Sequence, residues 1–152
     1  GEFTFSSLEQ ARNLSTMLAL ACPNSSLVAI GLQELMVNSV EHGNLGITAE
    51  EKQNLVMAGN WRAEINRRLS MEAYKHREVV VNFERNEKQI VFRITDAGDG
   101  FDYAQLLNAD APSGEAYRGR GIKLATDLSF SKVTYFGKGN EVEAVIDIAT
   151  SA

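Results

Sequence analysis

The spacing of hydrophobic positions along the chain predicts helices in its first half and strands in its second. Apolar residues recur every three or four positions over residues 8–21 and again over residues 27–40, which is typical of helices that bury one face. An alternating run at residues 3–5 predicts a first strand, and the serines at residues 6–7 are candidate N-caps. The second helix is expected to end at Gly43, because a left-handed helix stop favours glycine.

A charged segment over residues 49–77 is also expected to be mostly helical. Thr48 and Glu51 form a capping-box pattern at its start, with the threonine at the N-cap and the glutamate three residues later. The Gly-Asn pair at residues 59–60 is expected to interrupt it, and Trp61 is a candidate for packing on the body of the domain. The segment therefore predicts two short helices rather than one.

The second half of the chain contains four runs rich in β-branched residues, joined in pairs by short polar turns. These predicted strands cover residues 79–84, 89–96, 132–136 and 141–148. Between the two hairpins lie a looser lid region, residues 101–117, and a predicted helix, residues 120–129. Early helices and late hairpins predict an α+β fold: a two-layer α/β sandwich whose mostly antiparallel sheet is covered on one face by helices.

Composition narrows the class of protein. The chain has 152 residues, of which 44% are hydrophobic and 23% charged, as expected for one soluble globular domain. Its net charge of −5 argues against a nucleic-acid or anionic-membrane partner. No apolar run has the length of a membrane helix, and the lone Cys22 excludes an internal disulfide, so a cytoplasmic location is expected. The start at Gly1 suggests a domain excised from a longer protein.

The candidate chemistry begins on the second helix. Glu34, Asn38 and His42 follow one another at four-residue spacing, which places a carboxylate, a carboxamide and an imidazole along one helix face. By itself this row of three polar residues also fits a solvent-exposed helix face, or polar side chains that are hydrogen-bonded within the core. Two glycine-bearing stretches follow, at residues 96–102 and 118–124. Together they make the set that a nucleoside-triphosphate site with Mg²⁺ needs.

In this order the three stretches resemble the N, G1 and G2 boxes of the GHKL ATPase superfamily, which includes gyrase, histidine kinases and MutL. Within it the chain is most similar to the anti-sigma-factor serine/threonine kinases, because of its E-x-x-x-N-x-x-x-H-G helix and very short lid. The resemblance covers about residues 3–148 and implies the fold already predicted. The helical insertion, at about residues 48–77, departs from the smallest of these kinases and is similar to ATPase domains linked to response-regulator receivers. It is either a scaffold extension or a partner-docking surface.

The N-box residues have distinct expected roles. The resemblance makes Glu34 the general base that polarises the attacking hydroxyl or water, a role that needs a carboxylate within hydrogen-bond reach. Asn38 is expected to bind Mg²⁺ through its side-chain oxygen, because Mg²⁺ takes one or two protein oxygens beside the phosphates. His42 is expected at the lip of the nucleotide site or as a structural imidazole. Glu41 points elsewhere on the helix and is expected at the surface.

The G1 stretch is expected to recognise the base of ATP. In the resembled family the residue at the position of Asp96 accepts a hydrogen bond from the adenine amine, which selects adenine over guanine. Gly98 and Gly100 let the backbone approach the base and turn sharply, and Phe101 is expected to pack under it.

The G2 stretch is expected to hold the phosphates, since amides at a helix N-terminus bind anions. At least one cation of this stretch is expected to reach the β- or γ-phosphate, and the alternatives stay open. The candidate residues are Arg118, Gly119, Arg120, Gly121, Ile122 and Lys123.

One departure concerns the adenine pocket. Many superfamily members carry a threonine near the adenine on the last strand pair, whereas residues 139–142 here are Gly-Asn-Glu-Val. Either another group or a water fills that place, or the pocket is weaker than usual. The sequence at Asn140 does resemble receiver-linked members.

Two functions follow from these features. The first is an ATP-dependent protein serine/threonine kinase whose substrate is a STAS-type anti-sigma-factor antagonist and which can also sequester a sigma factor, as in partner switching. The second is a nucleotide-gated protein-binding module with little catalysis, in which ATP closes the lid and alters a partner surface. A histidine-kinase catalytic half is less favoured, because no dimerisation helix with an acceptor histidine is present. A gyrase-type hydrolase would need a longer chain. Members of the resembled family commonly pair as homodimers, so a homodimer is an expected assembly.

Overall fold

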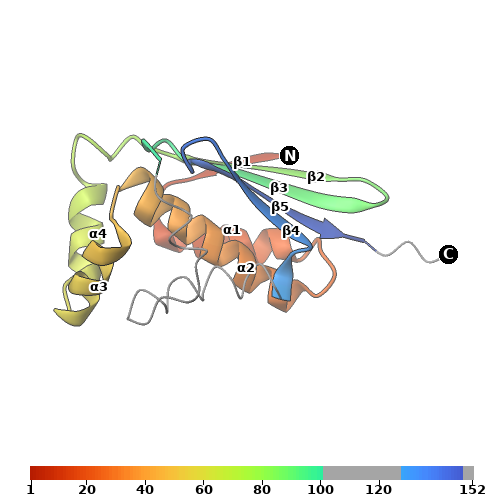
Figure 1. The fold of residues 1–152 in the computed structure, drawn as a ribbon, viewed down its shortest axis with the longest axis horizontal. Coiled ribbons are helices and arrows are strands. Elements are labelled where there is room, and N and C mark those ends of the chain that lie inside the picture. Colours follow the sequence, from red (N-terminus) through yellow and green to blue (C-terminus); the bar gives the residue numbers. More distant parts are fainter. Residues whose placement is uncertain (101–127, 149–152) are drawn as a thin grey trace.

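The first helix begins where its capping residue predicts. Residues 1–100 and 128–148 are described by the computed structural model. Helix α1 (Leu8–Ala19) begins after Ser7, whose hydroxyl accepts the Gln10 amide proton at 3.1 Å, while the Gln10 side chain accepts the Ser7 amide proton at 3.2 Å. This reciprocal pair satisfies two amide donors that a helix leaves open at its start. Helix α2 (Ser25–Asn38) follows after a turn and runs beside α1 (Figure 1).

Five strands form one antiparallel sheet: β1 (Glu2–Phe5), β2 (Val79–Arg85), β3 (Gln89–Thr95), β4 (Lys132–Phe136) and β5 (Glu141–Asp147). Their order is β1-β2-β3-β5-β4, and every neighbouring pair is antiparallel. Both predicted hairpins are therefore confirmed. Because β5 lies between β3 and β4, the residue after β3 meets the β4–β5 turn, where the Asp96 amide donates to the Asn140 carbonyl at 2.9 Å.

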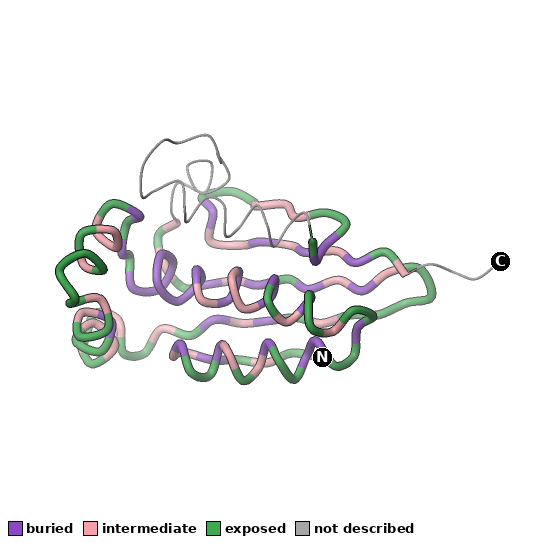
Figure 2. The backbone as a smooth tube through the Cα atoms, turned by 90° about the horizontal axis from the view of Figure 1, so that it is seen from below, coloured by how far each residue is buried: buried purple, intermediate pink, exposed green. Residues whose placement is uncertain are grey.

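The core lies between the sheet and the two long helices, as the predicted α+β sandwich requires. Leu32 and Met36 of α2 are fully buried, as are Phe92 and Ile94 of β3 on the inner sheet face. Removing one such side chain from water contributes about 1.5–3 kcal/mol. The outer face is polar, and Arg93 there pairs with two glutamates of β5. Buried and less buried residues accordingly alternate along the strands in Figure 2.

The second helix ends close to Gly43, at Asn44, but the left-handed stop expected at Gly43 is wrong. The helix widens into a π-helical turn, η1 (Ser39–Asn44), in which the Leu45 amide donates to the Val40 carbonyl at 2.9 Å. Gly43 lies inside this turn, and the left-handed glycine is Gly46, with φ of 64°. Single π-turns within helices are found frequently at functional sites.

Two short helices form the insertion, as predicted: α3 (Ala49–Met57) and α4 (Trp61–Leu69). The capping box at the start of α3 is confirmed, since the Thr48 hydroxyl accepts the Glu51 amide proton at 3.0 Å. Gly59 has φ of 75° and separates the helices. The pair lies at one end of the molecule and is largely exposed (Figures 1 and 2).

No helix among the described residues has the length and apolar character needed to cross a membrane. The expected lid, at about residues 102–118, and most of the helix expected over residues 120–129 lie outside the described residues.

Candidate functional site

Polar side chains from the C-terminal half of α2 and from β4 lie in one region with Asp96, the residue after β3. Asn38 is the last residue of α2 and is 2% exposed, and Glu34, one turn earlier, is half-buried. Tyr135 projects from β4 toward the core. Burial raises the pKa of the Tyr135 phenol far above its usual range, and the charges of Asp96 and Glu34 raise it further. Both carboxylates therefore lie near enough to Tyr135 for their charges to act on its phenol.

Asp96 is a buried carboxylate at the first position after β3. Burial is the main cause that raises its pKa from 3.8 to about 6, while a hydrogen bond from the Gly98 amide and the charge of Arg77 act in the opposite direction. The Gly98 amide donates to Oδ1 of Asp96 at 2.8 Å. Such a group can accept a hydrogen bond from a donor on a ligand, which is the chemistry expected for adenine.

The η1 turn and the G1 stretch pack backbone to backbone. A Cβ atom at Gly43 would overlap the carboxyl group of Asp96, and one at Gly98 would overlap the Gly43 carbonyl oxygen. The Asn44 side-chain oxygen accepts the Ala97 amide proton at 2.6 Å. Gly43 is therefore required for this close contact rather than for a helix stop.

We expect Gly98→Ala to lower the free energy of unfolding by about 1–3 kcal/mol, because the added methyl group meets a backbone carbonyl that cannot rotate away. Gly59→Ala is the matched control: its methyl group enters open space, so its cost of about 1 kcal/mol is backbone strain alone. Urea unfolding gives both values. Amide hydrogen exchange at Ala97 should rise only in Gly98→Ala, and equal exchange in the two variants would contradict the close contact.

His42 is buried, and its Nδ1 atom lies 2.5 Å from the Ile47 carbonyl oxygen. Since a carbonyl only accepts, Nδ1 carries the proton. This contact gives the imidazole a structural role at the end of η1, one of its two expected roles. A nucleotide contact by His42 stays a prediction.

The expectation that Glu41 lies at the surface is wrong. Its side chain is fully buried, and its carboxylate accepts from the Lys52 ammonium at 2.8 Å and from Trp61 Nε1 at 2.6 Å. The insertion covers this part of η1, and helical spacing alone contains no sign of that cover. Glu41, Asn44 and Tyr135 were all missed as site residues. Of these three residues, only Tyr135 could have been found from the sequence, because the alternation along its strand turns its side chain toward the core together with that of Val133.

The rest of the predicted site is described only in part. Gly100 has φ of 96° and packs against Lys138 of the β4–β5 turn, so the sharp turn expected there is present. The remaining nucleotide candidates lie outside the described residues: Phe101, Arg118, Gly119, Arg120, Gly121, Ile122 and Lys123.

The described residues fit the base and metal parts of MgATP. Asp96 offers a buried acceptor, and Asn38 offers an oxygen four residues after a carboxylate. Within residues 1–100 and 128–148 no group of three or more His, Cys, Asp or Glu side chains could hold a metal ion. Mg²⁺ beside phosphates does not need such a cage, since it keeps several waters.

A family model described as the histidine kinase-like ATPase domain matches residues 6–146, nearly the whole chain. No curated protein and no solved structure matches the chain.

Proposed function

We propose that this chain, which belongs to the histidine kinase-like ATPase domain family, is a protein serine/threonine kinase of the anti-sigma-factor type. Membership of the family makes it an ATP-binding, kinase-like ATPase. Its substrate is a STAS-type antagonist, phosphorylated on serine or threonine. The added phosphate carries about two negative charges and dissociates the antagonist from its partner. A sigma factor is the second protein that the domain can hold.

The observation that carries this proposal is that one continuous helix, α2 with η1, joins the residues for all three tasks. Glu34 and Asn38 lie on it one turn apart, and Gly43 packs against the Asp96 carboxylate. A base, a metal ligand and an adenine acceptor thus have positions that depend on a single rigid element. Such positioning is the main contribution a protein makes to phosphoryl transfer.

In the proposed mechanism each described residue has one task. Bound MgATP supplies the phosphoryl group and the metal charge that offsets developing negative charge. Asp96 would accept from the adenine amine, and the Asn38 oxygen would complete the coordination of the metal. Glu34 would take the proton from the attacking serine or threonine hydroxyl.

The first test is calorimetric ATP binding with and without Mg²⁺. We expect Asn38→Ala to weaken MgATP binding about 10- to 100-fold, the value of a hydrogen bond or ligand contact to a charged group. Binding without Mg²⁺ should change much less. Asn54→Ala, an exposed asparagine of α3, is the matched control and should bind like the wild type. If a folded Asn38→Ala variant binds ATP with the full Mg²⁺ dependence of the wild type, Asn38 is not the metal ligand. A wild type that binds no ATP would overturn the proposed function.

A second function, a nucleotide-gated binding module, is favoured by the insertion. Helices α3 and α4 contact η1 directly through Glu41, so a partner on the insertion would be close to the nucleotide residues. The lack of threonine at residues 139–142 also favours binding over catalysis. A Glu34 variant that binds ATP and keeps full biological output would support this module over the kinase.

A further inference from the structure

Glu41 ties the insertion to the helix that bears the proposed catalytic residues. Its buried carboxylate lies between Lys52 of α3 and Trp61 of α4, and the Lys52 ammonium also lies 4.8 Å from the centre of the Trp61 ring. A buried charge is stable only when it is paired and hydrogen-bonded. Separating the insertion from η1 would therefore leave Glu41 without these two partners.

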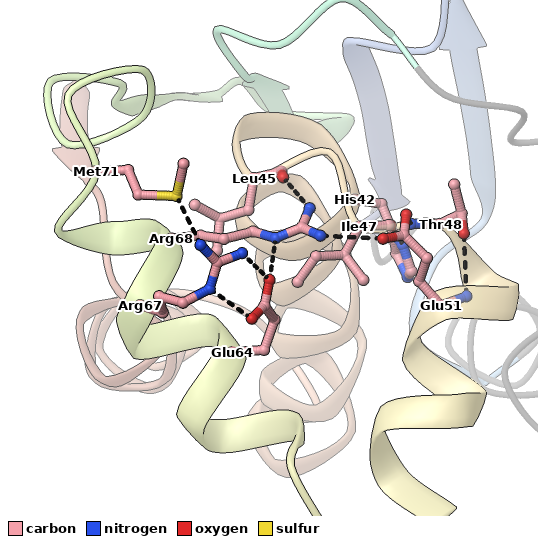
Figure 3. Close-up of polar contacts among 9 residues, drawn as sticks. All are labelled: His42, Leu45, Ile47, Thr48, Glu51, Glu64, Arg67, Arg68 and Met71. Atoms are coloured by element: carbon pink, nitrogen blue, oxygen red, sulfur yellow. Dashed lines mark hydrogen bonds and ion pairs between the residues drawn. The ribbon is translucent and has the colours of Figure 1, made fainter. Parts of the chain in front are cut away.

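Two arginines hold the backbone of the same turn. Arg68 of α4 donates to the Leu45 carbonyl at 2.9 Å, and Arg77 donates to the Asn44 carbonyl at 2.7 Å. Arg68 also binds Glu64 at 2.7 Å and Glu51 at 3.0 Å, which fixes its guanidinium from both helices of the insertion (Figure 3). These carbonyls lie at the end of η1, where a helix leaves its last acceptors open.

The η1 turn, held by these two arginines, also contacts the segment that contains Asp96, the proposed adenine acceptor. Asn44 accepts the Ala97 amide proton at 2.6 Å, and Gly43 packs on the Asp96 carboxylate. A continuous set of hydrogen bonds and packed backbone thus runs from α4 through Leu45 and Asn44 to the Asp96 turn.

We propose that the α3–α4 insertion positions the nucleotide site, with Arg68 as a positioning residue that holds η1 against the Asp96 turn. This inference rests on the proposed ATP site. It implies that a ligand at that site is sensed on α4, because the same contacts transmit displacement in both directions. Trp61, the only tryptophan of the chain, then reports nucleotide binding through its hydrogen bond to Glu41.

The test compares Arg68→Gln with Arg67→Gln, which remove the same charge from adjacent positions of α4. Both arginines bind Glu64. The Arg67 side chain is 59% exposed and contacts Glu64 and Met71, whereas the Arg68 side chain reaches the Leu45 carbonyl of the turn. We expect Arg68→Gln to weaken ATP binding roughly 2- to 30-fold, the range found for residues that couple sites. Arg67→Gln should stay within about twofold of the wild type. Arg68→Lys, which keeps a donor for Leu45, should fall between them.

Two further measurements separate positioning from stability. ATP should change Trp61 fluorescence in the wild type and in Arg67→Gln, and change it less in Arg68→Gln. Without nucleotide, amide exchange at Ala97 should be faster in Arg68→Gln than in Arg67→Gln. The two variants are compared under conditions in which their free energies of unfolding are equal, so that the difference reports the local contact. If the wild type binds no ATP, the proposed function fails, and the Ala97 exchange still decides the coupling. Equal ATP affinities and equal Ala97 exchange in the two variants would overturn the inference.

Discussion

Glu34→Gln is expected to slow phosphoryl transfer by at least two orders of magnitude while ATP binding stays close to that of the wild type. Glutamine has nearly the same size and fits the same half-buried place on α2, but it cannot accept a proton at neutral pH. Loss of a general base typically lowers the rate about 10²- to 10⁴-fold. The measurements are phosphate transfer from labelled ATP to a STAS-domain antagonist, and ADP formation with water as the acceptor, each beside a calorimetric ATP affinity.

Glu72→Gln is the control for this variant. Glu72 is exposed, forms an ion pair with Lys75 and lies far from the residues of the proposed site in the sequence. It should transfer phosphate at the wild-type rate. A Glu34→Gln variant that binds ATP and transfers phosphate as fast as the wild type would remove Glu34 as the base.

Asp96→Asn is expected to stabilise the fold at neutral pH and at the same time remove ATP binding. The buried carboxylate has a pKa of about 6, raised by burial from 3.8. Since one pKa unit corresponds to about 1.4 kcal/mol, the ionised group costs the fold up to about 3 kcal/mol. Asparagine removes that charge and keeps an oxygen for the Gly98 amide, so a gain of about 1–3 kcal/mol is expected.

The same substitution should weaken ATP binding by about 100-fold or more, because the amide nitrogen would face the adenine amine with a donor. The ratio of ATP to GTP affinity should fall for the same reason. Asp147→Asn, at the exposed end of β5, is the matched control and should change neither stability nor affinity. An Asp96→Asn variant that binds ATP like the wild type would exclude Asp96 as the adenine acceptor.

The stability gain has a defined pH dependence. The folded state binds the Asp96 proton more tightly than the unfolded state does, so the wild type becomes relatively more stable as the pH falls from 7 through about 6 toward 4. The advantage of Asp96→Asn should therefore be largest above pH 6 and fade toward about pH 4. Thermal unfolding of both proteins across this range measures it. A constant difference would mean that Asp96 is not the titrating group.

Local rules were sufficient for most of the elements. The capping boxes at Ser7 and Thr48, the break at Gly59 and both hairpins depend on residues within a few positions of one another, so the sequence pattern contains them. The same holds for the line of Glu34 and Asn38, because four-residue spacing on a regular helix has only one geometry. The family match extends this agreement from the elements to the fold.

The sequence by itself thus determined the fold class, the family and the helix that carries the proposed base and metal ligand. Only the tertiary structure decided the surroundings of that helix. Beyond Asn38 the chain widens into a π-turn, so the regular spacing that placed Glu41 at the surface no longer applies. Glu41 is buried by Trp61, twenty residues away, and glycine is required at position 43 by the Asp96 carboxylate, which follows β3. Such contacts join residues that are distant in the sequence. The spacing of hydrophobic residues carries information only about residues that are close to one another along the chain.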